Sequence, residues 1–318
     1  MNFFKTISKV FRSANYKLVV ISALCLQVCP IAFWVPAQAA ESQFGFVYTT
    51  DLLPKGEKEI EQWVTWRHQK IAGSYDLLEG KTAYEYGLTD DFQVALYASY
   101  AWNRANTNGP FGVTTPPEQF GYDRIGTSAN YSATRFIGFS VEEIWRMLSP
   151  YMDPFGLALY MEPTLGSRFF EFESRLILQK NYWDDTLVLG LNFTYAPEFR
   201  LLPNDDGNAG NAWKEEADVN LAIAASYRFA RNWSVGFEAI NEREFSALGF
   251  SDLANSGYYL GPSFHYGAKS FFVTGVALKQ FPWATEHAAT VPGAVVNGVD
   301  YDNDFELYRV RLKMGIYL

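Results

Sequence analysis

The sequence predicts an all-β fold, a transmembrane antiparallel up-and-down β-barrel of about twelve strands with both termini in the periplasm. Three observations predict it. Stretches of about 10–15 residues alternate apolar and polar side chains, which gives a strand one apolar face. Short and long connections alternate between these stretches. A basic and then apolar leader directs the chain out of the cytoplasm.

The leader, residues 1–39, has the three parts of a secretory signal peptide. Residues 1–17 carry four basic residues and no acid, residues 18–35 are apolar, and a small-residue cleavage site ends at Ala39. An uncleaved membrane anchor is the alternative, because 18 apolar residues approach a spanning length. Pro30 and the small-residue site favour cleavage.

Cleavage after Ala39 leaves 40–56 as a periplasmic N-terminal segment and 57–318 as an outer-membrane β-barrel. Both cysteines, Cys25 and Cys29, precede the cleavage site, so the mature chain has no disulfide and no thiol chemistry. Removal of four of the 26 basic residues leaves 22 against 35 acidic ones, a net charge of −13. That excess excludes nucleic acid as a partner, since phosphate binding needs a basic surface.

The alternation of period two predicts twelve strands, and we expect no cofactor among them. Beyond the leader no run of 18 apolar residues occurs, which excludes a helical membrane protein. In chain order the strands are expected at 57–70, 73–88, 91–103, 127–147, 155–165, 168–181, 186–197, 214–230, 232–243, 256–267, 270–280 and 304–318.

The clearest alternation lies in the first strand and in the second half of the chain. In 57–70 Ile60, Val64 and Trp66 share one face, opposite Glu57, Glu59 and Glu61. In 168–181 Phe170, Phe172, Leu176 and Leu178 oppose Glu171, Glu173 and Arg175. The strands 186–197 and 214–230 repeat this pattern, and 304–318 ends as YRVRLKMGIYL.

The length of a connection depends on whether it follows an even-numbered or an odd-numbered strand. Those after the second, fourth, sixth, eighth and tenth strands are tight and contain Asp, Asn, Gly or Pro, which favour turns. Those after the third, seventh, ninth and eleventh are long, the longest being 104–126 and 281–303. Transmembrane barrels have short periplasmic turns and longer outer loops, whereas a soluble β-sandwich has no reason to sort its loops in this way.

Three segments resemble an uncharacterised domain-of-unknown-function family of Gram-negative outer-membrane β-barrel proteins. They are TTDLLPKGEKEIEQWVTWR (49–67), YGLTDDFQVALYASY (86–100) and DPFGLALYMEPTLG (153–166). The resemblance implies the fold and a location in the cell outer membrane, and it implies no activity. The partners expected there are outer-membrane lipid and lipopolysaccharide, the barrel-assembly machinery and small polar solutes.

Assigning the apolar faces outward leaves a charged lumen. Its expected lining is Glu59, Glu61, Arg67, Glu79, Lys81, Glu85, Glu171, Glu173, Arg175, Glu216, Asp218, Arg228, Glu238, Arg309, Arg311 and Lys313. One function that follows is a porin-like channel or transporter for small polar solutes. The alternative is a closed structural barrel whose mixed charges pair across a narrow interior. Twelve strands lie between the eight that side chains fill and the sixteen that leave a channel, so strand number decides neither.

Catalysis and metal binding have weaker signals. Ser263 and His265 share one face of a strand and could serve a lipid-modifying enzyme, but two polar lumenal residues are the simpler interpretation. Three scattered His residues make a zinc site improbable. The acids of VDYDNDFE (299–306) recur at spacing two, which suits Ca²⁺, although a solvated acidic loop is the default.

The last strand is expected to close the barrel by pairing antiparallel with the first. Arg309, Arg311 and Lys313 would then face the acids of the first strand inside the lumen. Opposite charges on neighbouring strands stabilise by about 0.2–1 kcal/mol each. A slip of one residue would turn three cations toward lipid, so the pairs would also fix the register.

Overall fold

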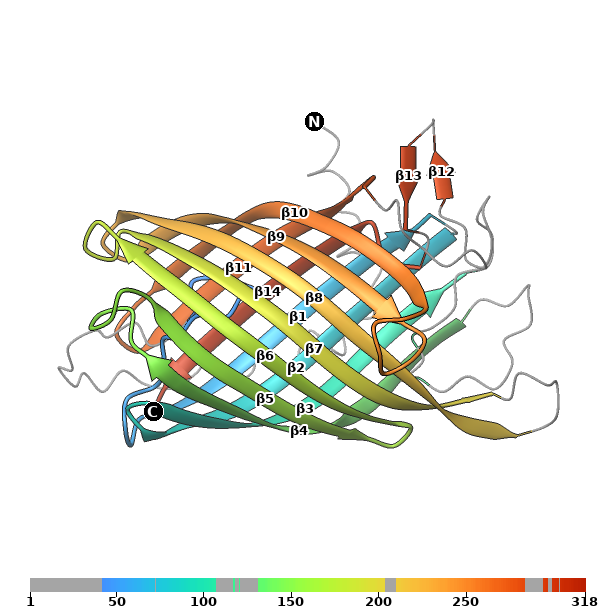
Figure 1. Cartoon of the computed structure of the whole chain (residues 1–318), viewed down its shortest axis with the longest axis horizontal. Coiled ribbons are helices and arrows are strands. Elements are labelled where there is room, and N and C mark those ends of the chain that lie inside the picture. Colours follow the sequence, from blue (N-terminus) through green and yellow to red (C-terminus); the bar gives the residue numbers. More distant parts are fainter. Residues whose placement is uncertain are drawn as a thin grey trace. The chain divides into compact units, whose positions relative to one another are not determined.

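The computed structural model describes residues 42–71, 73–106, 117, 120, 131–203, 210–283, 294–296, 299–302 and 304–318. No helix among them is long and apolar enough to cross a membrane. Twelve strands form one closed antiparallel barrel (Figure 1). They are β1 (Lys58–Lys70), β2 (Gly73–Thr89), β3 (Phe92–Ala105), β4 (Tyr131–Leu148), β5 (Gly156–Gly166), β6 (Phe169–Tyr182), β7 (Leu187–Pro203), β8 (Asn211–Ala230), β9 (Trp233–Phe245), β10 (Leu253–Gly267), β11 (Phe271–Phe281) and β14 (Tyr308–Tyr317).

The strands follow one another around the barrel, and β14 closes it by pairing with β1. The predicted up-and-down fold of about twelve strands is therefore confirmed. Two further strands, β12 (Ala294–Val296) and β13 (Val299–Tyr301), form a separate hairpin between β11 and β14. The connections after β2, β4, β6, β8 and β10 all lie at one end, here the turn end, where the C-terminus also lies (Figure 1), whereas the two-residue connections after β1 and β5 lie at the opposite end. We call the opposite end the loop end.

The strand boundaries differ from the prediction mainly at the loop end. β7 continues to Pro203 and β8 starts at Asn211, because these two strands stay paired beyond the alternating stretch. β14 starts four residues later than expected. Residues 304–307 are held in a turn instead, since the Asp302 carboxylate accepts the backbone N–H groups of Asp304 and Phe305. The predicted strand residues 127–130 lie outside the described part of the chain.

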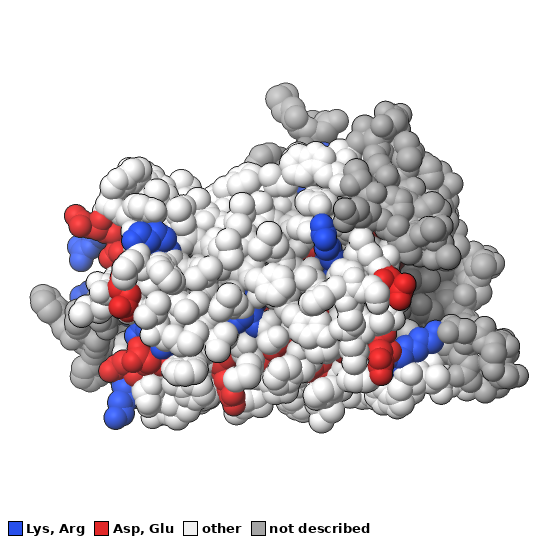
Figure 2. All heavy atoms as spheres, viewed as in Figure 1, with Lys and Arg blue, Asp and Glu red and all other residues white. Residues whose placement is uncertain are grey.

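The outer face of the barrel is apolar, as the alternation predicts. Large side chains stay exposed on it in most strands, among them Leu96, Phe139, Leu165, Ile223 and Leu312. Figure 2 shows a wall that is mostly free of charge, with the largest group of charged side chains near the turn end at the left and fewer toward the right end. An apolar band of this kind is what a barrel presents to lipid.

The interior is filled by more than the strands. Phe44, Val47 and Thr50 are at most 1% exposed, and they lie among side chains of the inner wall. Phe44 and Val47 belong to one apolar cluster with Val188 of β7 and Ile240 of β9. The segment 40–56 was expected in the periplasm. Its described residues 42–53 lie in the lumen instead, because the inner wall offers hydrogen-bonding partners along their whole length.

Candidate functional site: a lumen closed by the N-terminal segment

Residues 42–53, called the plug from here on, enter the lumen from the turn end and bend back within it. The end of the plug that leads into β1 is held at the turn-end rim, where Gln93 Oε1 of β3 accepts the N–H of Leu53 at 2.7 Å. The deepest residues are Gly45 and Phe46. The Ser42 hydroxyl donates to the Val47 carbonyl at 2.7 Å and closes the bend.

Polar side chains of three other strands bind the main chain of the plug. Gln179 of β6 accepts the N–H of Thr50 at 2.7 Å. Asn192 of β7 accepts the N–H of Tyr48 at 2.7 Å and donates to its carbonyl at 2.9 Å. The Glu238 carboxylate of β9 accepts the N–H groups of Gly45, Phe46 and Val47 at 2.7, 2.8 and 3.2 Å. Buried N–H groups need such partners, so the wall is matched to the plug.

Two arginines hold the aromatic side chains of the plug. The Arg311 guanidinium carbon lies 3.9 Å from the centre of the Phe46 ring, and Arg311 also donates to the Gly45 carbonyl at 3.1 Å. The Arg175 guanidinium carbon lies 4.4 Å from the centre of the Tyr48 ring, and its Nη1 donates to the Phe46 carbonyl at 3.4 Å. Cation–π contacts of this kind contribute about 0.5–2 kcal/mol each.

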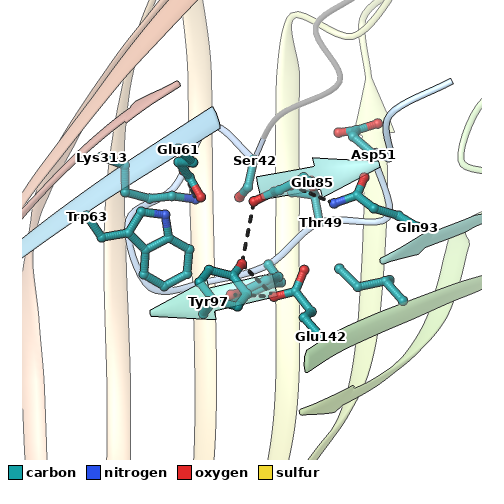
Figure 3. A pocket seen from close by; sticks show the side chains of 12 residues that line it. Ser42, Thr49, Asp51, Glu61, Trp63, Glu85, Gln93, Tyr97, Glu142 and Lys313 are labelled. Carbon is teal, nitrogen blue, oxygen red and sulfur yellow. Dashed lines mark hydrogen bonds and ion pairs between the residues drawn. The ribbon is translucent and has the colours of Figure 1, made fainter. Parts of the chain in front are cut away.

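Little space remains between the plug and this part of the wall. Figure 3 shows a cavity lined by Glu61, Trp63, Tyr97 and Lys313 on the wall and by Ser42 and Thr49 of the plug. Its volume is about 20 Å³, which is room for about one water molecule. The Tyr97 hydroxyl donates to Glu142 at 2.9 Å, and Gln93 donates to Glu85 at 2.8 Å. The plug therefore packs closely against this part of the wall.

The structure places all but one of the predicted lining residues on the inner face. Arg228 is the exception, because it lies at the exposed turn-end rim and donates to the backbone carbonyl of Asp184 at 3.0 Å. Arg228 is the third residue from the end of β8, so its side chain reaches the neighbouring turn more readily than the lumen. Inward-facing residues of the predicted set are Glu59, Glu61, Arg67, Glu79, Lys81, Glu85, Glu171, Glu173, Arg175, Glu216, Asp218, Glu238, Arg309, Arg311 and Lys313.

Several lumenal acids were not predicted. Glu142, Glu162 and Glu198 are at most 3% exposed and face inward from β4, β5 and β7. Glu162 pairs with Lys81 at 2.9 Å across the lumen, from strands that are not neighbours. The alternation that identified the other lining residues also runs through these strands and could have revealed them.

Carboxylates face one another across neighbouring strands on one side of the lumen. Glu162 lies opposite Glu173, and Glu198 lies opposite both Glu171 and Glu216. Like charges placed directly opposite destabilise a sheet. Arg175 and Arg200 offset this, because Arg175 binds Glu173 and Arg200 binds Glu198 and Glu216.

The predicted seam between the first and last strands forms, and it contains an ion pair. Lys313 Nζ lies 3.2 Å from Glu61, and both side chains are buried. The register places Arg311 opposite Thr65, to which it donates at 2.8 Å. Arg309 instead reaches Glu242 of β9 at 2.5 Å, so its partner lies across the lumen.

The weaker chemical signals resolve into ordinary contacts. Ser263 and His265 both face the lumen, as expected, but His265 Nδ1 contacts the Thr274 hydroxyl at 2.8 Å. Glu306 binds Arg67 and Arg309, at 2.9 and 2.5 Å, rather than joining Asp302. In the described part of the chain no group of three His, Cys, Asp or Glu residues is placed to hold a metal ion.

A model of a protein family described as "Family of unknown function (DUF6662)" matches residues 36–318. This range contains all three segments on which the resemblance of the sequence analysis rests. No curated protein matches the chain.

Solved structures share the fold. An outer membrane channel from Pseudomonas putida F1 is similar over 90% of this chain and 100% of its own, with a TM-score of 0.53 and 9% identity. The β domain of the Bordetella autotransporter BrkA has a TM-score of 0.48 at 9% identity, covering 83% and 100%. A FadL homologue from Pseudomonas aeruginosa has a TM-score of 0.42 at 8% identity, covering 87% and 96%. The fold is that of outer-membrane β-barrels.

Proposed function

The chain belongs to the family of unknown function DUF6662, and we propose that it is an outer-membrane conduit for small polar solutes that its own N-terminal plug closes. In this proposal the turn end faces the periplasm and the loop end faces the outside, as short turns and long loops are arranged in known barrels. The leader delivers the chain to the periplasm, and cleavage after Ala39 frees the plug.

One observation carries the proposal: polar side chains of the wall bind the main chain of the plug. Glu238, Asn192, Gln179 and Gln93 bind its main chain, and water can replace each of these bonds when the segment withdraws. A lumen lined by charged and amide side chains is wettable once it is empty. The plug therefore resembles a removable closure more than a permanent core.

The alternative is a closed structural barrel, and the interior argues against it. In a small structural barrel the inward side chains of the strands fill the space themselves. Here twelve residues from outside the sheet do so, and Phe44 and Val47 complete the main apolar cluster of the lumen. Without the plug the wall would surround a water-filled passage.

Planar-bilayer recordings test the proposal. We compare the mature chain, 40–318, with a variant in which a Gly/Ser linker of equal length replaces 42–53. The mature chain should show rare or small conductance steps, and the variant should show larger steps of long duration. A heat-modifiable gel shift establishes that each protein is a folded barrel. A folded variant that stays silent in the bilayer would refute the conduit.

A further inference from the structure

The seat of the plug has a chemistry of its own, and the following step rests on the proposed function. The wall binds the main chain of residues 45–50 by hydrogen bonds with Glu238, Asn192 and Gln179. Main-chain contacts do not depend on sequence, so any chain that adopts the same conformation, with its bend at residues 43–46, offers the same donors and acceptors. This is how proteins commonly bind peptides.

If the plug withdrew, the seat would expose a carboxylate, an amide and two guanidinium groups at fixed positions on the wall. Glu238 is fully buried beside the plug and would lose three N–H donors. Asn192 would lose both a donor and an acceptor. Arg311 and Arg175 would each lose a carbonyl and an aromatic face.

The side chains of the plug define the rest of the seat. The Tyr48 ring packs edge-on against Tyr160 with 5.0 Å between ring centres, and it lies 6.2 Å from the ring of Trp63. The Phe46 ring lies under Arg311 and within 5.6 Å of the Arg309 guanidinium carbon. Two aromatic sites thus stand two residues apart, at the bend of residues 43–46 and just after it.

We propose that this seat is a binding site for short peptides that carry aromatic side chains and adopt the bend of the plug, and that such peptides are the solutes of the conduit. The plug is then a resident ligand that occupies the path of the solute. An arriving peptide takes over the bonds to Glu238 and Asn192 and the faces of Arg311 and Arg175, and the plug withdraws toward the turn end.

The competition is physically reasonable. A tethered segment acts at an effective concentration in the millimolar range when its linker is short. A free peptide with the same contacts competes when its own concentration reaches that range. The seat therefore needs no high affinity for either occupant, and a conduit needs a weak site so that the solute can leave.

The test uses the full mature chain with Val47→Cys, a position 1% exposed in the closed state. Thiol-labelling rate reports withdrawal of the plug. Acetyl-Gly-Phe-Val-Tyr-amide, which copies residues 45–48, should raise the labelling rate in a saturable manner and by at least about tenfold. Acetyl-Gly-Ala-Val-Ala-amide, which lacks the rings, should have little effect. The Gly-Phe-Val-Tyr peptide N-methylated at Phe and Val should also fail, because it loses two of the three N–H groups that Glu238 accepts.

The outcomes separate the two proposals. If no peptide changes the labelling rate while the plug-replaced barrel conducts, the peptide site is refuted and the conduit stands. If the peptide accelerates labelling while that barrel is silent, the site stands and the conduit falls. Equal acceleration by p-cresol or by the N-methylated peptide would overturn the claim that the main chain is recognised.

Discussion

Glu238→Gln should release the plug without unfolding the barrel. In the structure one carboxylate oxygen accepts the N–H of Gly45, and the other accepts those of Phe46 and Val47. The amide keeps one acceptor oxygen, but its NH₂ group then points at N–H donors. The variant therefore loses the negative charge and at least one of the three hydrogen bonds.

The magnitude follows from these bonds. A hydrogen bond to a charged group contributes about 1.5–3 kcal/mol, and 1.4 kcal/mol is a factor of ten in an equilibrium constant. We expect the fraction of withdrawn plug to rise roughly 10- to 150-fold. Barrel stability should change little, because Glu238 makes these bonds to the plug and not to other strands.

Thiol labelling measures the change. The chain from residue 40 contains no cysteine, so Val47→Cys supplies a single reporter. The labelling rate follows the withdrawn fraction when opening and closing are fast. Glu171→Gln is the matched control. It makes the same chemical change on the inner wall, at a position that makes no hydrogen bond or ion pair to the described residues of the plug. Equal labelling rates in Glu238→Gln and the parent, both folded by gel shift, would refute the reasoning.

Three further predictions concern the wall and the loop end. Gly190→Val should also raise conductance, because a Cβ there would lie 2.8 Å from Val47 Cγ1; an unchanged closed state would contradict this packing. Lys313→Glu should slow assembly, because it replaces the cation that lies 3.2 Å from Glu61 by a second buried acid. The rate is measured as the growth of the folded gel band over time, and Lys58→Glu on the exposed rim is the control. Burial opposes ionisation of Glu306, but Arg309 and Arg67 outweigh it and lower its pKa to about 2. Its contribution to stability is therefore present above about pH 4.5 and lost as the pH falls toward 2, and urea unfolding of Glu306→Gln should lack that acid-dependent loss.

The strands and the seam could be predicted because period two is a local property of a chain. One apolar face per strand places Arg309, Arg311 and Lys313 in the lumen, and the parity of the connections gives the up-and-down order. Both are confirmed, as is the resemblance to an uncharacterised outer-membrane family. The partners of these cations depend on which residues meet across the barrel, which a local pattern does not contain. Arg309 thus finds Glu242 instead of an acid on β1.

The plug was missed for a related reason. Residues 42–56 show no alternation, so a reading by period assigns them to the periplasm by default. Their burial depends on Gln93, Gln179, Asn192 and Glu238, which lie 40 to 193 residues away in sequence. Each of these looks like one more polar lumenal residue until the closed barrel brings them around a common chain.

The position of the plug ahead of all the strands in the chain has a consequence for biogenesis. Its seat is built from β3, β6, β7 and β9, and Arg311 belongs to β14, the last strand to be made. Residues 42–53 precede every strand of the barrel in the chain, yet their seat is complete only when β14 is in place. Under the proposed function, each newly inserted molecule then passes through an interval in which the barrel is closed, the plug is not yet seated and the lumen conducts.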